Sequence, residues 1–139
     1  AGALDEWLVE AAYRRLSETT SHPGLAGTLD DLLQVKQRHR EFFETQARHR
    51  LAESPSAAAL ARRRLRRMAW PLGSAEETPE ALTLLLDGLL DASDLATIDR
   101  RLDAYPGLAG LGLATGARRR AIRRAGRPTD SRPKGEPRP

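Results

Sequence analysis

The segment LLQVKQRHREFF, residues 32–43, carries side chains whose types and spacing suit metal or acid–base chemistry. It has the pattern of an amphipathic helix, with Lys36 on the apolar stripe and His39 at its edge. An isolated ammonium group is costly to bury, so Lys36 must meet a carboxylate, lose its proton or reach solvent along its alkyl stem. Glu6, on the preceding amphipathic segment, is the candidate partner.

The elements that must position these side chains are helices. No stretch of strand-forming residues alternates with polar ones, which predicts an all-α fold. Pro, Gly and Ser residues divide the chain into helices, which we expect at residues 3–20, 28–53, 56–70, 79–91 and 91–105, with a weaker one between 106 and 126. Thr28 is the expected N-cap of the second helix, after a turn at SHPGLAG, residues 21–27.

If that turn reverses the chain, residues 3–53 form a long antiparallel helical hairpin. Glu6 then lies about 16 residues before the centre of the turn, and Lys36 and His39 lie about 12–15 residues after it, at similar heights along the hairpin. We therefore predict an ion pair between Lys36 and Glu6. Two alternatives stay open: Lys36 extends into solvent, and His39 is a partly buried histidine bonded to a neighbour.

The pattern is a glutamate on one helix, a reversal of the chain, and a histidine at a similar height on the next helix. It resembles half of the metal site of the ferritin-like di-iron carboxylate bundles. The resemblance covers about residues 4–52 and includes the HPGL turn and the RHREFF sequence. It is a resemblance to the helix pair of ferritin-like oxidases and acyl-carrier desaturases. It implies a ferritin-like hairpin with shorter C-terminal helices, an iron cofactor and an ancestral oxygen-dependent redox chemistry.

Carried over to this chain, the resemblance makes Glu6 and His39 metal ligands and puts Lys36 where a bridging glutamate is expected. An ammonium group has no lone pair to offer a metal, and the chain has no second Glu-x-x-His. We therefore expect a degenerate or partial di-iron carboxylate protein with a vestigial site and no catalytic residue. An N-terminal segment outside this sequence is the alternative source of the remaining ligands.

Two arginine-rich stretches, ARRRLRRMAW and ARRRAIRRAGR, carry the surplus positive charge of the chain. The candidate anion-binding residues are Arg118, Arg119, Arg120, Arg123 and Arg124. They support an alternative function, a basic helical binding module for an acidic partner or nucleic acid. No stacking aromatics and no helix-turn-helix pattern accompany them, so a solvated face in an arginine-biased sequence is the simpler interpretation.

The composition limits the remaining classes. Cysteine is absent, which excludes disulfides and thiolate metal sites, and with no signal-peptide pattern we expect a cytoplasmic protein. No run approaches the roughly 18 apolar residues of a membrane span. We expect one helical domain at 1–125, with the hairpin at 3–53 and further helices at 56–124, then a disordered tail at 126–139. A homo-oligomer or partner helices are the expected partners besides nucleic acid.

Overall fold

The described part of the chain contains helices and no strand, which confirms the all-α prediction. A computed structural model describes residues 2–68, 70–71 and 78–126, apart from the Pro79 side chain. Its elements, in chain order, are α1 (Gly2–Thr19), α2 (Pro23–Glu53), α3 (Pro55–Arg67), α4 (Pro79–Thr83), the π-helical turn η1 (Leu84–Leu89), α5 (Ala92–Asp103) and α6 (Leu113–Ala125). Apart from Gly126, the tail expected at 126–139 lies outside the described residues. None of the described helices is both long and apolar enough to cross a membrane.

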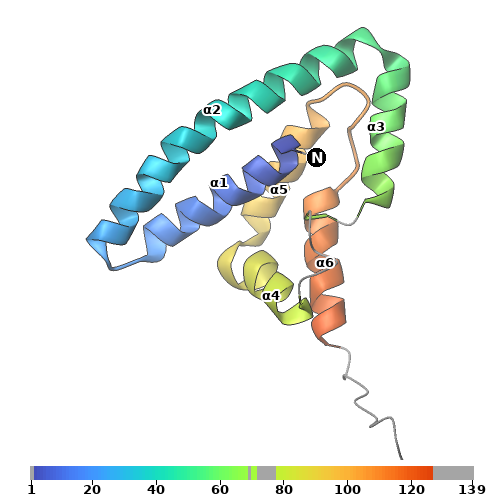
Figure 1. Cartoon of the computed structure of the whole chain (residues 1–139). Coiled ribbons are helices and arrows are strands. Elements are labelled where there is room, and N and C mark those ends of the chain that lie inside the picture. The colour runs from blue at the N-terminus through green and yellow to red at the C-terminus, as the bar shows by residue number, and fades with distance from the viewer. Residues whose placement is uncertain (1, 69, 72–77, 127–139) are drawn as a thin grey trace, which may run out of the picture.

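Helices α1 and α2 form the predicted antiparallel hairpin, which projects from the rest of the molecule (Figure 1). Near the turn, the Ser17 hydroxyl donates to Asp30 Oδ1 at 3.0 Å. Toward the other end of α1, the Trp7 indole N–H donates to Glu44 Oε1 at 2.6 Å. These two contacts between distant residues fix the direction of the hairpin.

The start of α2 differs from the prediction, because the helix begins at Pro23 and not after Thr28. The His22 imidazole Nδ1 accepts from the Leu25 backbone N–H at 3.2 Å and so caps the helix. Pro23 suits the first turn, where a backbone N–H has no partner within the helix. Gly24, which indicated a loop, is helical, and its carbonyl accepts from the Thr28 hydroxyl at 3.0 Å.

Two later helices also depart from the expected bounds. α3 ends at Arg67 instead of residue 70, since Met68 is extended, with φ −76° and ψ 135°. The helix expected at 79–91 is regular only to Thr83 and continues as the π-helical turn η1. There the Leu90 N–H bonds to the Leu85 carbonyl at 3.1 Å, five residues back.

The apolar core lies among α1, η1, α5 and α6. Its largest fully buried side chains are Trp7, Trp70, Leu86, Leu90 and Leu95. α6 turns small residues toward this core, and they are Ala114, Ala117 and Ala121. In contrast, α2 has 31 residues and buries only Leu29 among them. Most of the surface of α2 is therefore not used to stabilise the described fold.

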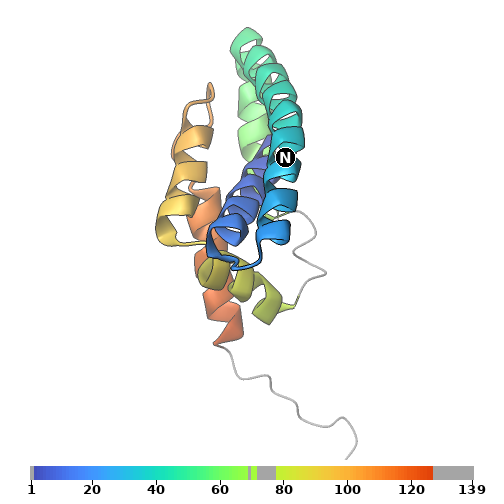
Figure 2. The ribbon, with the colours of Figure 1, turned by 90° about the vertical axis from the view of Figure 1, so that its left-hand side faces the viewer.

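The order of the helices across the molecule is visible from a second side. Figure 2 shows α1 between α2, at one edge, and α5, at the other. α3 descends from the end of α2 toward the start of α6 (Figure 1). The Arg62 guanidinium of α3 donates to the carbonyls of Gly107 and Ala109, at 3.0 and 2.7 Å, and so holds the loop between α5 and α6.

Candidate functional site

The predicted ion pair between Lys36 and Glu6 is present where α2 contacts α1. Lys36 Nζ lies 3.2 Å from Glu6 Oε1, and the two side chains are 30% and 15% exposed. The other oxygen, Glu6 Oε2, is buried and accepts no hydrogen bond in the structure. A carboxylate directly opposite thus explains why a lysine is tolerated on this stripe.

His39, the third residue of the predicted cluster, does not join this contact. It lies on α2 three residues after Lys36, where its side chain is exposed. No hydrogen bond or ion pair links it to another described residue. The expectation that the imidazole faces Glu6 is therefore wrong, because the His39 side chain, about one helical turn beyond Lys36, is exposed.

Glu10, which the sequence did not single out, is the most heavily bonded acid of the hairpin. Although only 9% exposed, it receives three guanidinium groups, from Arg14 at 2.8 Å, Arg40 at 2.5 Å and Arg101 at 3.2 Å. Burial raises the pKa of Glu10, but the hydrogen bond from Arg40 and the charges of Arg101 and Arg40 outweigh it and lower the pKa below its ordinary value. The carboxylate is thus held ionised where α1, α2 and α5 meet.

The carboxylates of the hairpin do not form a donor set that fits a metal. Glu6 is bound to an ammonium, Glu10 to guanidinium groups, and Glu44 to the Trp7 indole and to Arg40 at 3.6 Å. Iron carboxylate sites need anionic oxygens that converge on the ion, and here each acid faces a cation or a neutral donor instead. In the described ranges, no three His, Cys, Asp or Glu side chains gather where they could hold a metal ion.

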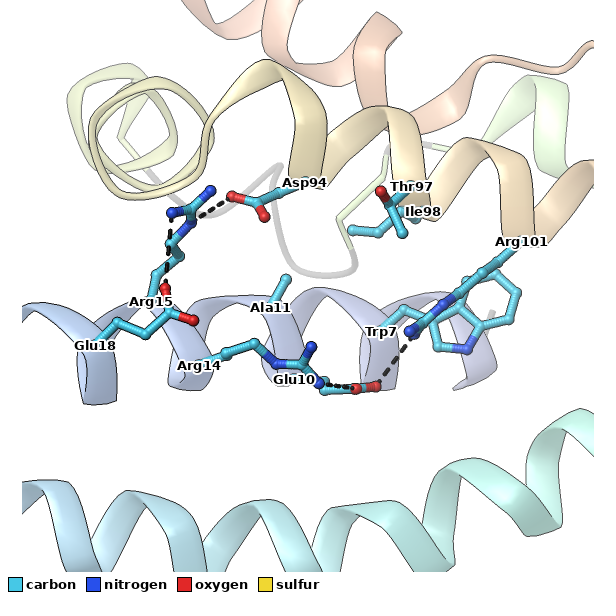
Figure 3. A pocket seen from close by; sticks show the side chains of 10 residues that line it. All are labelled: Trp7, Glu10, Ala11, Arg14, Arg15, Glu18, Asp94, Thr97, Ile98 and Arg101. Carbon is cyan, nitrogen blue, oxygen red and sulfur yellow. Dashed lines mark hydrogen bonds and ion pairs between the residues drawn. The ribbon is translucent and has the colours of Figure 1, made fainter.

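A shallow groove runs between α1 and α5, and its walls are polar (Figure 3). At one end, Arg15 of α1 donates to Asp94 at 2.8 Å and also to Asp91, both near the start of α5. At the other end, Glu10 meets Arg101 of α5. The charges that line this groove are largely matched with each other, so it is better suited to joining two helices than to binding a charged ligand.

The C-terminal helix α6 carries a cluster of positive charge that no acidic residue of its own matches. Arg119, Arg120 and Arg123 follow Gly116 at helical spacings of three, four and seven, which puts them on one exposed face. A shallow surface hollow lies among these residues and Ile122. The Arg120 guanidinium folds back over Gly116, where an added Cβ would lie 3.2 Å from its Nη1. Burial and then the charges of Arg124, Arg123 and Arg119 lower the pKa of Arg120.

The five candidate anion-binding residues therefore divide into two groups. Arg118 points to η1 and is paired with Asp87, through both Nε and Nη2. The other four, Arg119, Arg120, Arg123 and Arg124, form no ion pair with a described residue, and we call them the α6 arginine face. Among the five candidates, only this face has cations available for a partner; the exposed arginines of α3, which are Arg63, Arg64, Arg66 and Arg67, likewise form no ion pair with a described residue.

Asp99 of α5 is a second important acid that sequence reasoning missed. It is 9% exposed, and its oxygens accept from the backbone N–H groups of Ala114 and Thr115 at 2.9 and 3.0 Å. It thereby caps α6, whose own N-cap residue, Gly112, has no side chain to do so. The signal was an aspartate on the apolar stripe of Leu95, Ile98 and Leu102, of the same kind as the lysine in α2.

The comparisons with protein families, with curated proteins and with solved structures give no match to this chain. The description of the site therefore depends on its geometry alone.

Proposed function

We propose that this chain is a helical binding module that engages a phosphate-rich polyanion, such as nucleic acid, through the α6 arginine face. The observation that carries the proposal is the surface hollow on α6 lined by Arg119, Arg120 and Arg123, on a helix that has no acidic residue and whose exposed arginines have no acidic partner in the described part of the chain. Cations this close repel each other, so an anion placed among them is stabilising. Phosphate groups match the planar, multiply donating guanidinium well.

The hairpin has a supporting role in this proposal. Two of its acids with little exposure, Glu6 and Glu10, are matched by Lys36 and by Arg14, Arg40 and Arg101, so neither presents free negative charge beside the core. The contacts between α1 and α5 and between Asp99 and α6 join the hairpin to the helix that carries the arginines. The module would thus present α6 on a fixed scaffold.

A binding titration tests the proposal. We expect the chain to bind a labelled DNA duplex with a strong salt dependence, and a variant with Gln at Arg119, Arg120, Arg123 and Arg124 to lose most of that affinity. The slope of log K against log salt concentration should become shallower by up to about 3.6, at about 0.9 for each phosphate that an arginine no longer neutralises.

The matched control removes the same charge from another helix. Arg63, Arg64, Arg66 and Arg67 of α3 are exposed, and replacing them with Gln lowers the net charge equally. We expect this variant to keep most of the affinity. Equal losses in both variants would show that net charge alone attracts the polyanion, and no binding by the unaltered chain would overturn the proposal.

We also propose a kinship of the hairpin with ferritin-like bundles, with Lys36 in place of a metal-ligand glutamate. The specific observation in favour is the 3.2 Å contact between Lys36 and Glu6, the residue that the resemblance makes a ligand. In such a degenerate site, one ammonium supplies positive charge to a carboxylate that a metal would otherwise neutralise. Lys36 would then stabilise the hairpin, which a change of this residue can measure.

A further inference from the structure

The outer side of α2 carries an apolar stripe that is largely exposed, although the ring of Phe43 at its margin lies against Gly2 of α1. Its members are Leu25, Leu32, Val35 and Phe42, which are 47%, 40%, 55% and 62% exposed, with Phe43 beside them at 40%. Figures 1 and 2 both show α2 at an edge of the molecule, with no other labelled element over its outer side. This stripe lies on the longest helix and is too regular to be a scatter of single apolar side chains.

The spacing of the stripe is that of a coiled-coil seam. Leu25, Thr28, Leu32, Val35, His39 and Phe42 follow each other at intervals of three, four, three, four and three residues. Alternating intervals of three and four keep a stripe facing one partner helix along its whole length. Side chains of α2 that contact α1, such as Lys36 and Arg40, lie on the neighbouring side of the helix. The seam is therefore free for a helix that this chain does not supply within its described residues.

The seam of one α2 is complementary to the seam of a second α2 that runs in the opposite direction. With a second α2 antiparallel and centred between Leu33 and Gln34, Leu25 meets Phe42, Thr28 meets His39, and Leu32 meets Val35, each contact occurring twice. In each of these contacts, a residue from the first half of the seam in one copy faces a residue from the second half of the seam in the other copy. A two-fold axis produces such reciprocal contacts, in which the same patch is used on both copies.

Charges beside the seam fit the same arrangement. Asp31 and Arg38 flank it on the side away from Lys36, both are exposed, and neither forms an ion pair with a described residue. In the antiparallel register, Asp31 of one copy lies near Arg38 of the other, and the symmetry repeats the pair. In a parallel arrangement in register, this flank of one copy lies on the opposite side of the pair from the same flank of the other, so Asp31 and Arg38 do not meet.

We propose that the outer face of α2 is the interface of a homodimer in which two α2 helices pack antiparallel about a two-fold axis. The seam from Leu25 to Phe42 is about 26 Å long. Partly exposed Leu16 and Tyr13 of α1 lie toward the turn end of the hairpin and extend the apolar surface beside it. The proposal concerns a surface that the α6 arginine face does not include, so the two proposals stand or fall separately.

Association in solution is the first test. Sedimentation of the full 139-residue chain over a range of concentrations should show a monomer–dimer equilibrium. Val35→Asp should weaken dimerisation at least about tenfold, because it puts a charge in the middle of the seam. Leu84→Asp is the matched control, since Leu84 is 70% exposed on η1, away from the seam. Its dimerisation should be unchanged, and circular dichroism should show both variants folded.

Charge exchange tests the antiparallel pairing. Asp31→Arg alone and Arg38→Asp alone should each weaken the dimer, since each creates two like-charge contacts. The double variant D31R/R38D should restore most of the affinity, because it rebuilds both pairs with their signs reversed. A double variant as weak as the sum of the single changes would overturn the proposed register.

The absence of cysteine from the chain allows a test of direction. In the proposed register, the two copies of Val35 lie about 4–5 Å apart along the axis and the two copies of Phe42 about 25 Å apart. Val35→Cys should therefore form a disulfide-linked dimer under mild oxidation and Phe42→Cys should not. Crosslinking of both would indicate a parallel dimer, and a chain that stays monomeric at all concentrations would overturn the proposal altogether.

Discussion

Charged residues on apolar stripes are the most informative single residues of this chain. Lys36 on α2 and Asp99 on α5 both occupy positions where a leucine would fit the pattern. Each is paired with a group on another element, Lys36 with Glu6 and Asp99 with the first N–H groups of α6. In both cases the cost of burying the charge is offset by a specific partner, and the position of the charge fixes how two helices meet.

The Lys36–Glu6 pair can be tested with a double-mutant cycle. Lys36→Met keeps the apolar stem and leaves the Glu6 carboxylate, which is 15% exposed, without its cation. We expect a loss of about 1 kcal/mol in the free energy of unfolding, and a smaller further loss when Glu6→Gln is added, measured by urea denaturation at pH 7. Additive losses would show that the two side chains do not stabilise each other and would remove the support for Lys36 as the stand-in for a metal.

Single elements of this fold are positioned by side chains from their neighbours as much as by their own sequence. α6 begins at a glycine with positive φ, +56° at Gly112, and has no capping side chain of its own. Asp99 replaces that cap from α5 and also accepts from the Thr115 hydroxyl at 2.8 Å. The helix that carries the arginine face is thus placed by one buried carboxylate.

Removal of this cap should therefore destabilise the fold. Asp99→Ala leaves two backbone N–H groups without an acceptor, and we expect a loss of about 2 kcal/mol in the free energy of unfolding. Asp99→Asn keeps one oxygen acceptor and should lose less. Thermal unfolding followed by circular dichroism measures both, with Asp103→Asn on the same helix as the control, since it keeps the oxygen that accepts from the Gly110 N–H. Equal stability of D99A and the unaltered chain would contradict the role of Asp99.

The number and bounds of the helices show how much of the fold the sequence can predict. Apolar periodicity and Pro positions indicated the number and approximate bounds of the long helices, and the hairpin brought Lys36 to Glu6. The start of α2 was missed because a histidine N-cap before Pro23 outweighs the weak helix propensity of Gly24 and Gly27. The roles of Glu10 and Asp99 were missed because they depend on which helices pack together, and helical periodicity does not contain that information.

In the whole molecule, Glu10 connects three helices that are far apart in the sequence. Its partners Arg40 and Arg101 come from α2 and α5, so its ionisation affects the cohesion of the entire fold. The folded pKa of Glu10 is lower than its ordinary value of 4.5. The Glu10 carboxylate therefore binds a proton at a higher pH in the unfolded state than in the folded state. The contribution of Glu10 to the free energy of unfolding is present above about pH 4.5 and is lost as the pH falls through the folded pKa.

We accordingly expect the free energy of unfolding to decrease steeply with acid below about pH 4.5. Glu10→Gln should cost about 2 kcal/mol at pH 7, because it removes the anion that three partly exposed guanidinium groups contact, and it should flatten the decrease at acid pH. Glu18→Gln is the control, since Glu18 is 55% exposed and pairs only weakly with Arg15, at 3.7 Å. Urea unfolding at a series of pH values measures the slopes. An unchanged acid dependence in E10Q would contradict the stabilising role of Glu10.

The environment of Trp7 has a practical consequence for following the hairpin in solution. Its ring is 2% exposed, bonds to Glu44 of α2 and lies 5.8 Å from the ring of Tyr105 beyond α5. The second tryptophan, Trp70, follows α3 in the sequence and is buried in the same core. In a Trp70→Phe background, the fluorescence emission of Trp7 would therefore report on the opening of the junction among α1, α2 and α5, shifting to longer wavelength as water reaches the indole.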